Sequence, residues 1–345
     1  HTHGHGHTAN QKFPRGQQKT SNIYIKPSKC TLPMMARAKS QLRTITGVVK
    51  DATAIAKAFV TSNSAVFQAQ RAVVRATSVR DRNSPPPESK LLEVISAVQI
   101  SKPATAAVVR SLLDRLHRTR DAFVALKCLY TIHSVLQNGS LDAKRELLIN
   151  GGSRSLIMVT FRDKTDNNAW ELSSWVRWYA SVVEQKLKVP WVPSFPIGVN
   201  GEHANSQRLL GKEVFALATS DLISGLGVLV ALVELISDAP PSLQQTPLVY
   251  EVIRLVSYDY GSTQKQILML MEAVDDRVHD LGYEEIDRVF HMLKRLEDCK
   301  ENLGSLFQNR NRYDGYWEKM RELSEKCALN LKEKTETMRL VLYGT

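Results

Sequence analysis

Five basic residues lie close together in the sequence, around a break between two expected helices. They are Arg71, Arg75, Arg80, Arg82 and Lys90. Arg71 and Arg75 are one helical turn apart, and the other three follow within and just after a loop that contains Ser-Pro-Pro-Pro. Guanidinium and ammonium groups that converge from a helix and a nearby loop bind compact, highly charged phosphate groups well. The spacing therefore predicts a binding site for a phosphorylated anion.

The distribution of charge points to the same end of the chain. The net charge is +11, and residues 1–34 contribute five basic and no acidic residues. Residues 37–90 contribute ten basic and three acidic residues, whereas residues 91–345 are balanced. Such asymmetry indicates an anionic partner, either a membrane surface or nucleic acid, although a solvated basic face is the simpler alternative. Further candidate membrane-facing residues are Lys39, Arg43, Lys50 and Lys57.

Aromatic residues help to choose between the two anionic partners. RNA-binding proteins usually place aromatic side chains among the basic ones, because bases stack on them. Between residues 37 and 90 the aromatic residues are Phe59 and Phe67, both at apolar-face positions. A phosphoinositide headgroup needs no stacking, and each basic residue near an anionic membrane contributes about 1 kcal/mol. We therefore favour a phosphoinositide membrane, with a helical protein-interaction scaffold as first alternative and a nucleic-acid-binding protein as second.

The elements that must position these residues are expected to be helices. Apolar residues recur at three- and four-residue spacing along most of the chain, and no alternating strand pattern occurs. The predicted helices cover about 36–60, 65–78, 88–99, 102–118, 120–140, 142–149, 169–188, 207–237, 245–258, 262–281, 283–308 and 313–341. Short connections between them predict an all-α fold, an irregular helical solenoid.

The domain organisation is predicted from composition. Residues 1–34 have no periodicity, and we interpret them as disordered or as a non-native extension before Met34 or Met35. Residues 35–345 are expected to form one domain. Its predicted parts are an N-terminal superhelix (35–188), a linker rich in Pro, Gly and Asn (189–207) and a C-terminal bundle (208–345).

Most side chains that could carry out other chemistry are better explained by packing. In the very apolar helix over 120–140, Lys127 and His133 are expected to reach the surface or to satisfy neighbouring groups rather than to act as ligands. Four aromatic residues are interpreted as packing anchors: Trp170, Trp175, Trp178 and Tyr179. The apolar stretch 222–236 is too short to span a bilayer and is expected to be a buried helix.

No motif indicates catalysis. The chain contains no GxGxxG, GxxxxGK[ST], HExxH or GxSxG sequence, so we do not expect an enzyme, a cofactor or a metal site. The alternating histidines His1, His3, His5 and His7 are weak metal candidates. The four cysteines form no close pairs and are expected to be reduced thiols: Cys30, Cys128, Cys299 and Cys327.

Four stretches carry a resemblance to a known family. They are VVRATS (73–78), RLHRTRDAFVALKCLYTIHSVLQNG (115–139), FRDKTDNNAWELSSWVRWYASVVEQKL (161–187) and, more weakly, FHMLKRLEDCKE (290–301). Over residues 37–345 the chain resembles the ANTH domain, the phosphoinositide-binding module of clathrin-assembly adaptors, and is most similar to its plant members. The resemblance implies an all-α fold, an irregular right-handed helical solenoid or superhelix extended by a C-terminal helical bundle.

The resemblance also implies a site for phosphatidylinositol 4,5-bisphosphate. The family's helix Lys matches Arg75, a basic residue one turn earlier matches Arg71, and the final basic or aromatic position falls on Lys90. The family's loop cations fall on Pro87 and Ser89, and the loop is about two residues longer. Arg80 and Arg82 are therefore expected to compensate from another direction.

The implied partners follow from the family. They are a phosphoinositide membrane, clathrin and adaptor proteins, and a SNARE helix, whereas nucleic acid is not expected. The chain contains no NPF, DPF or DLL motif, which the family uses to contact clathrin and adaptors. The implied location is the cytoplasmic face of membranes, in clathrin-coated pits and vesicles of the plasma membrane or Golgi.

Overall fold

The fold is described by a computed structural model. It describes residues 43–44, 46–53, 64–138, 141–151, 156, 158–189, 214–242, 244–307 and 314–343. Among these residues there is no β-strand. Residues 43–44 and 46–53 are helical and are called the N-terminal helix below. The later helices are α2 (Ser64–Ala76), α3 (Glu88–Ile100), α4 (Lys102–Arg118), α5 (Ala122–Asn138), α6 (Leu141–Gly151), α7 (Asn167–Lys188), α9 (Thr219–Ser237), α10 (Pro247–Asp275), α11 (Tyr283–Asp298), α12 (Lys300–Leu306) and α13 (Asp314–Tyr343).

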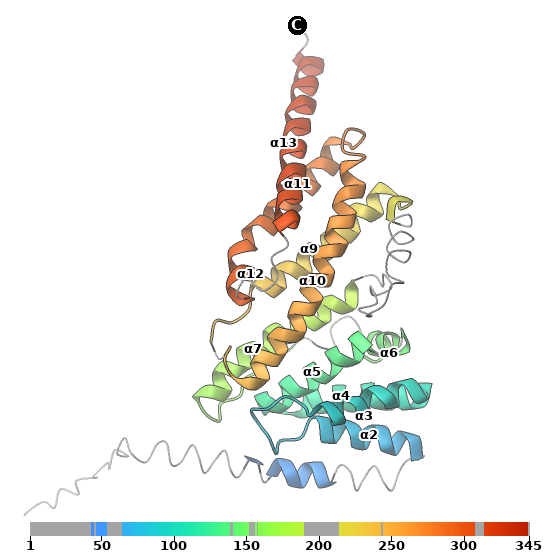
Figure 1. The fold of residues 1–345 in the computed structure, drawn as a ribbon, viewed down its shortest axis with the longest axis vertical. Coiled ribbons are helices and arrows are strands. Elements are labelled where there is room, and N and C mark those ends of the chain that lie inside the picture. Colours follow the sequence, from blue (N-terminus) through green and yellow to red (C-terminus); the bar gives the residue numbers. More distant parts are fainter. Residues whose placement is uncertain are drawn as a thin grey trace, which may run out of the picture.

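The helices stack on one another in chain order (Figure 1). α2 packs on α3 and α4, α4 packs on α5 and α6, and α5 packs on α7. The second half continues the stack, because α7 contacts α9, α9 contacts α10 and α11, and α11 contacts α13. The N-terminal helix and α2 lie at one end of the molecule, and α13 extends from the other (Figure 1). The predicted all-α superhelix is confirmed.

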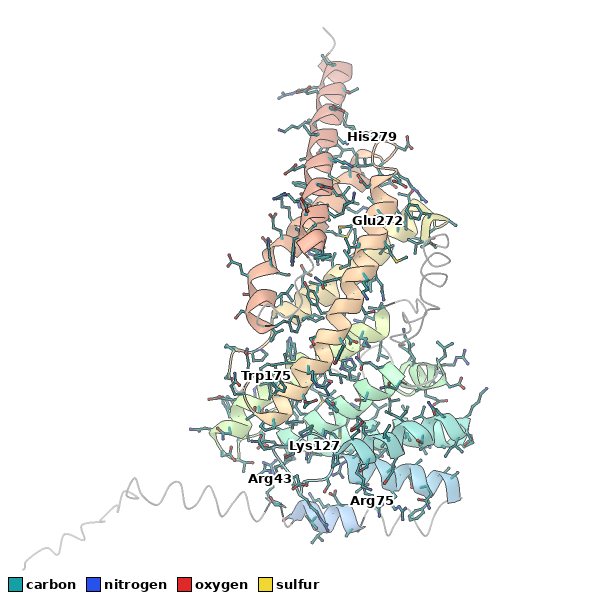
Figure 2. All side chains as sticks on the ribbon, in the orientation of Figure 1. Arg43, Arg75, Lys127, Trp175, Glu272 and His279 are labelled. Carbon is teal, nitrogen blue, oxygen red and sulfur yellow. The ribbon has the colours of Figure 1, made fainter. Side chains whose placement is uncertain are left out.

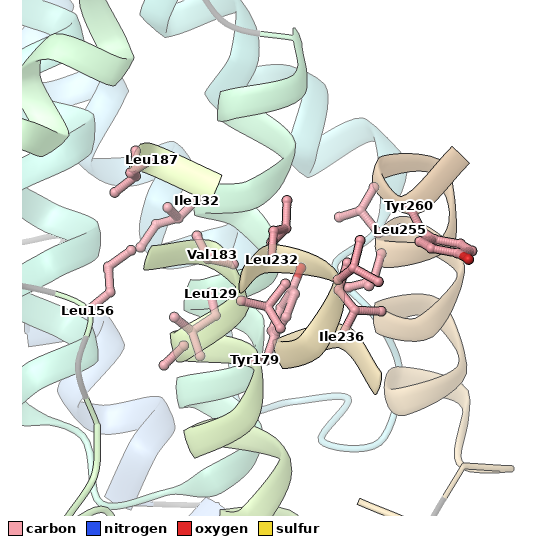
Figure 3. Packing of buried hydrophobic residues seen from close by; sticks show 14 of the residues in the cluster. Leu129, Ile132, Leu156, Tyr179, Val183, Leu187, Leu232, Ile236, Leu255 and Tyr260 are labelled. Atoms are coloured by element: carbon pink, nitrogen blue, oxygen red, sulfur yellow. The ribbon is translucent and has the colours of Figure 1, made fainter. Parts of the chain in front are cut away.

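Helix α5 forms the centre of the first half, as its composition predicts. Asp121 caps its beginning, because one carboxylate oxygen accepts hydrogen bonds from the backbone N–H groups of Phe123 (3.0 Å) and Val124 (3.3 Å). Thirteen of its 17 residues are buried. Figure 3 shows that side chains from α5, α7, α9 and α10 meet in one continuous core.

Two tryptophans of α7 join the first half to the second. The indole N–H of Trp175 donates to the carbonyl of Ser242 (2.7 Å), and that of Trp178 donates to the carbonyl of Leu235 (2.7 Å). Both rings are buried, as is Tyr179, so these three are packing anchors as predicted. The prediction for Trp170 is wrong: its side chain is 51% exposed, because it lies on the outward face of the first turn of α7.

Helix α9 contains the apolar stretch 222–236 and is long and apolar enough to cross a membrane by composition alone. In the fold it packs against α7, α10, α11 and α12, and Leu226, Val230 and Val233 are completely buried. This agrees with the prediction of a buried helix. The described cysteines Cys128, Cys299 and Cys327 are buried free thiols.

Three predicted helix boundaries are wrong. The helix expected over 207–237 is interrupted at 216–218, between helical residues 214–215 and α9, where Arg277 donates to the carbonyls of Phe215 (2.5 Å) and Leu217 (2.8 Å); residues 207–213 lie outside the described residues. The two helices expected over 245–281 are mostly one, α10, which runs through Gly261 and ends at Asp275. The helix expected over 283–308 is interrupted at Cys299, between α11 and α12.

Candidate functional site

Two of the predicted site residues converge from different helices. Arg75, in the last turn of α2, and Lys90, in the first turn of α3, both face Glu93. The Arg75 guanidinium lies 3.8 Å from one carboxylate oxygen, and the Lys90 ammonium lies 2.5 Å from the other. The side chains of Arg75 and Lys90 are 41% and 33% exposed, so both cations remain accessible to an anion in solution.

Arg71 lies one turn before Arg75 on α2. Its guanidinium carbon is 5.9 Å from the centre of the Phe67 ring, a cation–π distance. Residues at i and i+4 of a helix share a face, so Arg71 extends the row of cations along α2. Figure 2 shows Arg75 at the same end of the molecule as Arg43, with Lys127 deeper in the fold. Arg71, Arg75 and Lys90 are called the basic cluster below.

Arg82 lies apart from the basic cluster. Its guanidinium pairs with Asp121 at 3.0 Å and lies over the Phe123 ring, with 4.8 Å from the guanidinium carbon to the ring centre. Its side chain is 14% exposed. The same aspartate caps α5, so Arg82 connects the α2–α3 loop (residues 77–87) to the beginning of the central helix.

Lys127 of α5 contacts the same loop. Its ammonium group donates to the backbone carbonyls of Ser78 (3.0 Å) and Asp81 (2.5 Å). Burial lowers the pKa of Lys127 to about 8, although the negative charges of Asp81 and Asp121 oppose the shift. The prediction that Lys127 satisfies neighbouring groups is therefore confirmed, and its role is to shape the loop.

Arg80 is the exposed cation of this loop. It is close enough to Asp51 of the N-terminal helix to act on that carboxylate. Burial raises the pKa of Asp51, and the charges of Arg115 and Arg80 oppose this rise. Arg115 pairs with Asp51 at 2.7 Å and also donates to the carbonyl of Thr77 (3.0 Å). The structure thus places Arg80 near the N-terminal helix and not at Glu93.

The N-terminal helix borders a groove of about 830 Å³ against α2 and α4. Arg43, at its beginning, pairs with Asp163 at 2.5 Å and donates to the carbonyl of Arg120. Lys50 is exposed and lines the groove. Lys39 and Lys57 lie outside the described residues.

Three arginines in this groove were not predicted as site residues. Arg115, Arg118 and Arg120 line it, from the end of α4 and the turn that follows. The signal in the sequence is their spacing in RLHRTR, which places three cations within six residues. Only Arg118 and Arg120 are exposed, and Arg118 lies 3.5 Å from Asp114. Among the described residues, no group of three His, Cys, Asp or Glu side chains could hold a metal ion.

The structure is a superhelical stack of helices with exposed cations at the end formed by the N-terminal helix, α2 and the α2–α3 loop, which is called the tip below. These features define the class of protein, an all-α module with a basic end. Residues 68–315 match the family model of the ANTH domain. The chain therefore belongs to the ANTH domain family.

Three similar proteins are from Arabidopsis thaliana. "Putative clathrin assembly protein At4g40080" is 32% identical over 282 residues, which cover 79% of this chain and 77% of the relative. "Putative clathrin assembly protein At5g10410" is 30% identical and covers 79% of this chain and 82% of its own length. "Probable clathrin assembly protein At4g32285" is 38% identical over 150 residues, which are 43% of this chain but 23% of that longer protein.

Proposed function

We propose that the chain binds membranes that contain phosphatidylinositol 4,5-bisphosphate and acts there as an adaptor in clathrin-coat assembly. The basic cluster supplies the principal contacts to the headgroup. Lys50, Arg118 and Arg120, with Lys39, Lys57 and Arg80, add attraction to the surrounding anionic lipid. Arg82 and Arg43 are engaged with Asp121 and Asp163, so their proposed role is to position the loop and the N-terminal helix.

One observation carries this proposal. Arg75 and Lys90 come from successive helices and share a single carboxylate, that of Glu93. Two exposed cations with one counter-ion leave a net positive charge where a phosphate group can replace or join the carboxylate. Charge-assisted hydrogen bonds from Arg and Lys to phosphate are among the stronger ones in proteins.

The adaptor role is supported by the relatives, whose names describe clathrin assembly proteins. The orientation is supported by the fold. If the N-terminal helix and α2 face the membrane, α13 extends away from it and remains available to other proteins (Figure 1). We place this activity at the cytoplasmic face of clathrin-coated pits and vesicles, at the plasma membrane or Golgi.

The test is cosedimentation of the full chain with phosphatidylcholine vesicles, with and without phosphatidylinositol 4,5-bisphosphate. An Arg71/Arg75/Lys90→Ala variant is expected to lose about 100-fold in affinity, because each basic residue contributes about 1 kcal/mol. The matched control is Lys332/Lys334/Arg339→Ala, which removes the same charge from α13 at the opposite end. This control should bind like the wild type.

The results separate the alternatives. Binding that needs the phosphoinositide and is lost in the first variant alone supports the proposal. Equal losses in both variants would mean that total charge, and not this cluster, attracts the membrane. If the wild-type chain binds no better to vesicles that contain phosphatidylinositol 4,5-bisphosphate than to vesicles without it, the result would favour a protein-interaction scaffold.

A further inference from the structure

The α2–α3 loop carries an exposed serine with an unusual sequence around it. Ser84 follows Arg80 and Arg82 and precedes three prolines, in the sequence Arg-Asp-Arg-Asn-Ser-Pro-Pro-Pro. The chain contains one other Ser/Thr-Pro pair, Thr246–Pro247. Thr246 is half-buried at the beginning of α10, whereas Asn83 and Ser84 are exposed.

The hydroxyl of Ser84 is available for chemistry. Its backbone N–H donates to the carbonyl of Asp81 (3.2 Å), but its Oγ makes no hydrogen bond to the described part of the chain. Neighbouring groups fix the backbone of the residues that precede Ser84. Lys127 binds the carbonyls of Ser78 and Asp81, and the N–H of Leu248 donates to the carbonyl of Asn83 (3.0 Å). Ser84 is therefore presented on a well-held loop.

We propose that Ser84 is a phosphorylation site for a proline-directed protein kinase, and that its phosphate weakens membrane binding. In the transfer step, the Ser84 hydroxyl oxygen forms a bond to the γ-phosphorus of ATP and the bond to the ADP oxygen breaks. The hydroxyl proton passes to the kinase's catalytic base. The inference rests on the proposed function, because it concerns regulation of the same membrane-binding tip.

The local charge balance makes this site sensitive to a phosphate. Residues 64–93 contain the five basic residues named first and three acidic ones, Asp81, Glu88 and Glu93. A phosphoserine adds about −1.5 to −2 charges at pH 7, which cancels the excess. Pro87 has φ −57° and ψ 136°, close to polyproline II, whose rise is about 3.1 Å per residue. At this rise the four residues from Ser84 to Glu88, at the start of α3, span about 12 Å, so screening over a Debye length of about 8 Å reduces but does not remove the effect of the phosphate there.

Two preparations of the full chain test the modification. The wild type and Ser84→Ala are incubated with ATP, Mg²⁺ and a proline-directed kinase of the mitogen-activated class, and phosphate is located by mass spectrometry. We expect stoichiometric phosphate on Ser84 and none at that peptide in Ser84→Ala. A wild type that acquires no phosphate at Ser84 would overturn the proposed site.

The effect on binding is measured separately with phosphoserine genetically encoded at Ser84. The probe is phosphatidylcholine vesicles containing phosphatidylinositol 4,5-bisphosphate. We expect roughly 10- to 30-fold weaker binding, because up to two charges are cancelled. The control carries phosphoserine at Ser305, exposed on α12 in the second half of the stack, and should bind nearly as well as the unmodified chain.

The outcomes distinguish this inference from the proposed function. If the unmodified chain does not bind these vesicles, the proposed function is wrong, and so is its proposed regulation by phosphorylation of Ser84. If the unmodified chain binds but phosphorylation at Ser84 leaves the affinity unchanged, only the proposed regulation by Ser84 is wrong. Equal weakening by phosphate at Ser84 and Ser305 would also overturn it, because the effect would then depend on total charge.

Discussion

At the scale of single residues, Glu93 controls how much positive charge the tip presents. It accepts contacts from both Arg75 and Lys90, and its own side chain is 39% exposed. Such exposed ion pairs contribute little to stability, about 0–1 kcal/mol. We expect a larger effect on the proposed phosphoinositide binding, because a phosphate would compete with this carboxylate for the same two cations.

Replacing Glu93 therefore tests the site without removing any cation. We expect Glu93→Gln to raise affinity for phosphatidylinositol 4,5-bisphosphate vesicles about 3- to 5-fold, because one opposing charge is lost near the membrane. The control is Glu297→Gln, which removes a similar i,i+3 pair with Lys294 (2.8 Å) on α11. Vesicle titration measures both. Weaker binding of Glu93→Gln would contradict a headgroup site between Arg75 and Lys90.

Lys127 is expected to affect the proposed vesicle binding through the α2–α3 loop, whose carbonyls it contacts. In Lys127→Met the carbonyls of Ser78 and Asp81 lose a charged donor, and a hydrogen bond to a charged group contributes about 1.5–3 kcal/mol. We expect faster amide hydrogen exchange across 77–84 and several-fold weaker vesicle binding. The comparison is Lys144→Met, which removes a similar contact to the carbonyl of Val189 (2.8 Å). If loop exchange stays at the wild-type rate, Lys127 does not position the loop.

At the scale of elements, the N-terminal helix is attached at both ends. Arg43 contacts Asp163 near its beginning, and Asp51 contacts Arg115 near its end. Burial raises the pKa of Asp163, but hydrogen bonds from Thr165, the Ala122 N–H and Arg43 outweigh it and lower that pKa overall. Between these two ends the helix approaches the α2–α3 loop at Gly47. A Cβ on Gly47 would lie 2.7 Å from Cγ2 of Val79, which is buried.

Gly47→Ala is expected to loosen this helix. Val79 is β-branched and has few other rotamers, so the helix must shift, at a cost of about 1–3 kcal/mol. Limited proteolysis should cut near residues 43–53 sooner than in the wild type, with a lower melting temperature. The matched variant is Gly261→Ala in α10, where a Cβ meets nothing within 4 Å and should stabilise the helix by about 0.5–1 kcal/mol. Unchanged cleavage of Gly47→Ala would refute the close contact.

Gly261 also illustrates which parts of the fold could be predicted from sequence. Periodicity predicts most of the helices, because each buries one apolar face. The continuity of α10 depends instead on long-range burial of Val256, Tyr260 and Ile267, which outweighs the cost of a glycine. The break before Thr219 depends on Arg277, more than 50 residues away, and no local pattern contains that information.

The candidate site was predictable to a similar extent. The basic residues were evident as types, and Arg75 and Lys90 do come together across the loop. What sequence could not reveal is which cations already have partners. The contacts of Arg82 with Asp121 and of Arg43 with Asp163 join positions 39 and 120 residues apart. Pairing over such separations depends on how the helices stack, and it divides the cations into those that fix the tip and those that face outward.

At the scale of the whole molecule, one buried polar network joins the two halves of the stack. His133 of α5 is completely buried, with Nδ1 2.8 Å from the Tyr179 hydroxyl and Nε2 2.6 Å from Asp259 of α10. Asp259 also accepts from Lys186 and from Gln137 (2.9 Å). Burial raises the pKa of Asp259, but its contacts with His133 and Lys186 outweigh this effect and keep it ionised. Because Lys186 already balances that charge, a neutral His133 completes the network.

This junction should make the stability of the molecule depend on pH. Burial lowers the pKa of His133 below 6.5, so the folded chain keeps it neutral where the unfolded chain takes up a proton. The contribution of neutral His133 to stability is therefore fully present above about pH 6.5. It is lost as the pH falls from there toward the lowered pKa of His133 in the folded chain. The slope approaches about 1.4 kcal/mol per pH unit for one proton. Urea denaturation from pH 7.5 to pH 5 measures this loss.

Two variants isolate the contribution of His133 to that pH dependence. His133→Gln should be less stable at pH 7.5, because it cannot reproduce both hydrogen bonds, and its stability should decline less between pH 7 and 5. His279→Gln removes an exposed histidine near the far end of the molecule and should keep the wild-type decline (Figure 2). If the stability of His133→Gln declines as steeply with falling pH as that of the wild type, protonation of a group other than His133 causes the decline. If its decline in stability is flatter, protonation of one buried imidazole loosens the contact between the half that carries α2 and the half that carries α13.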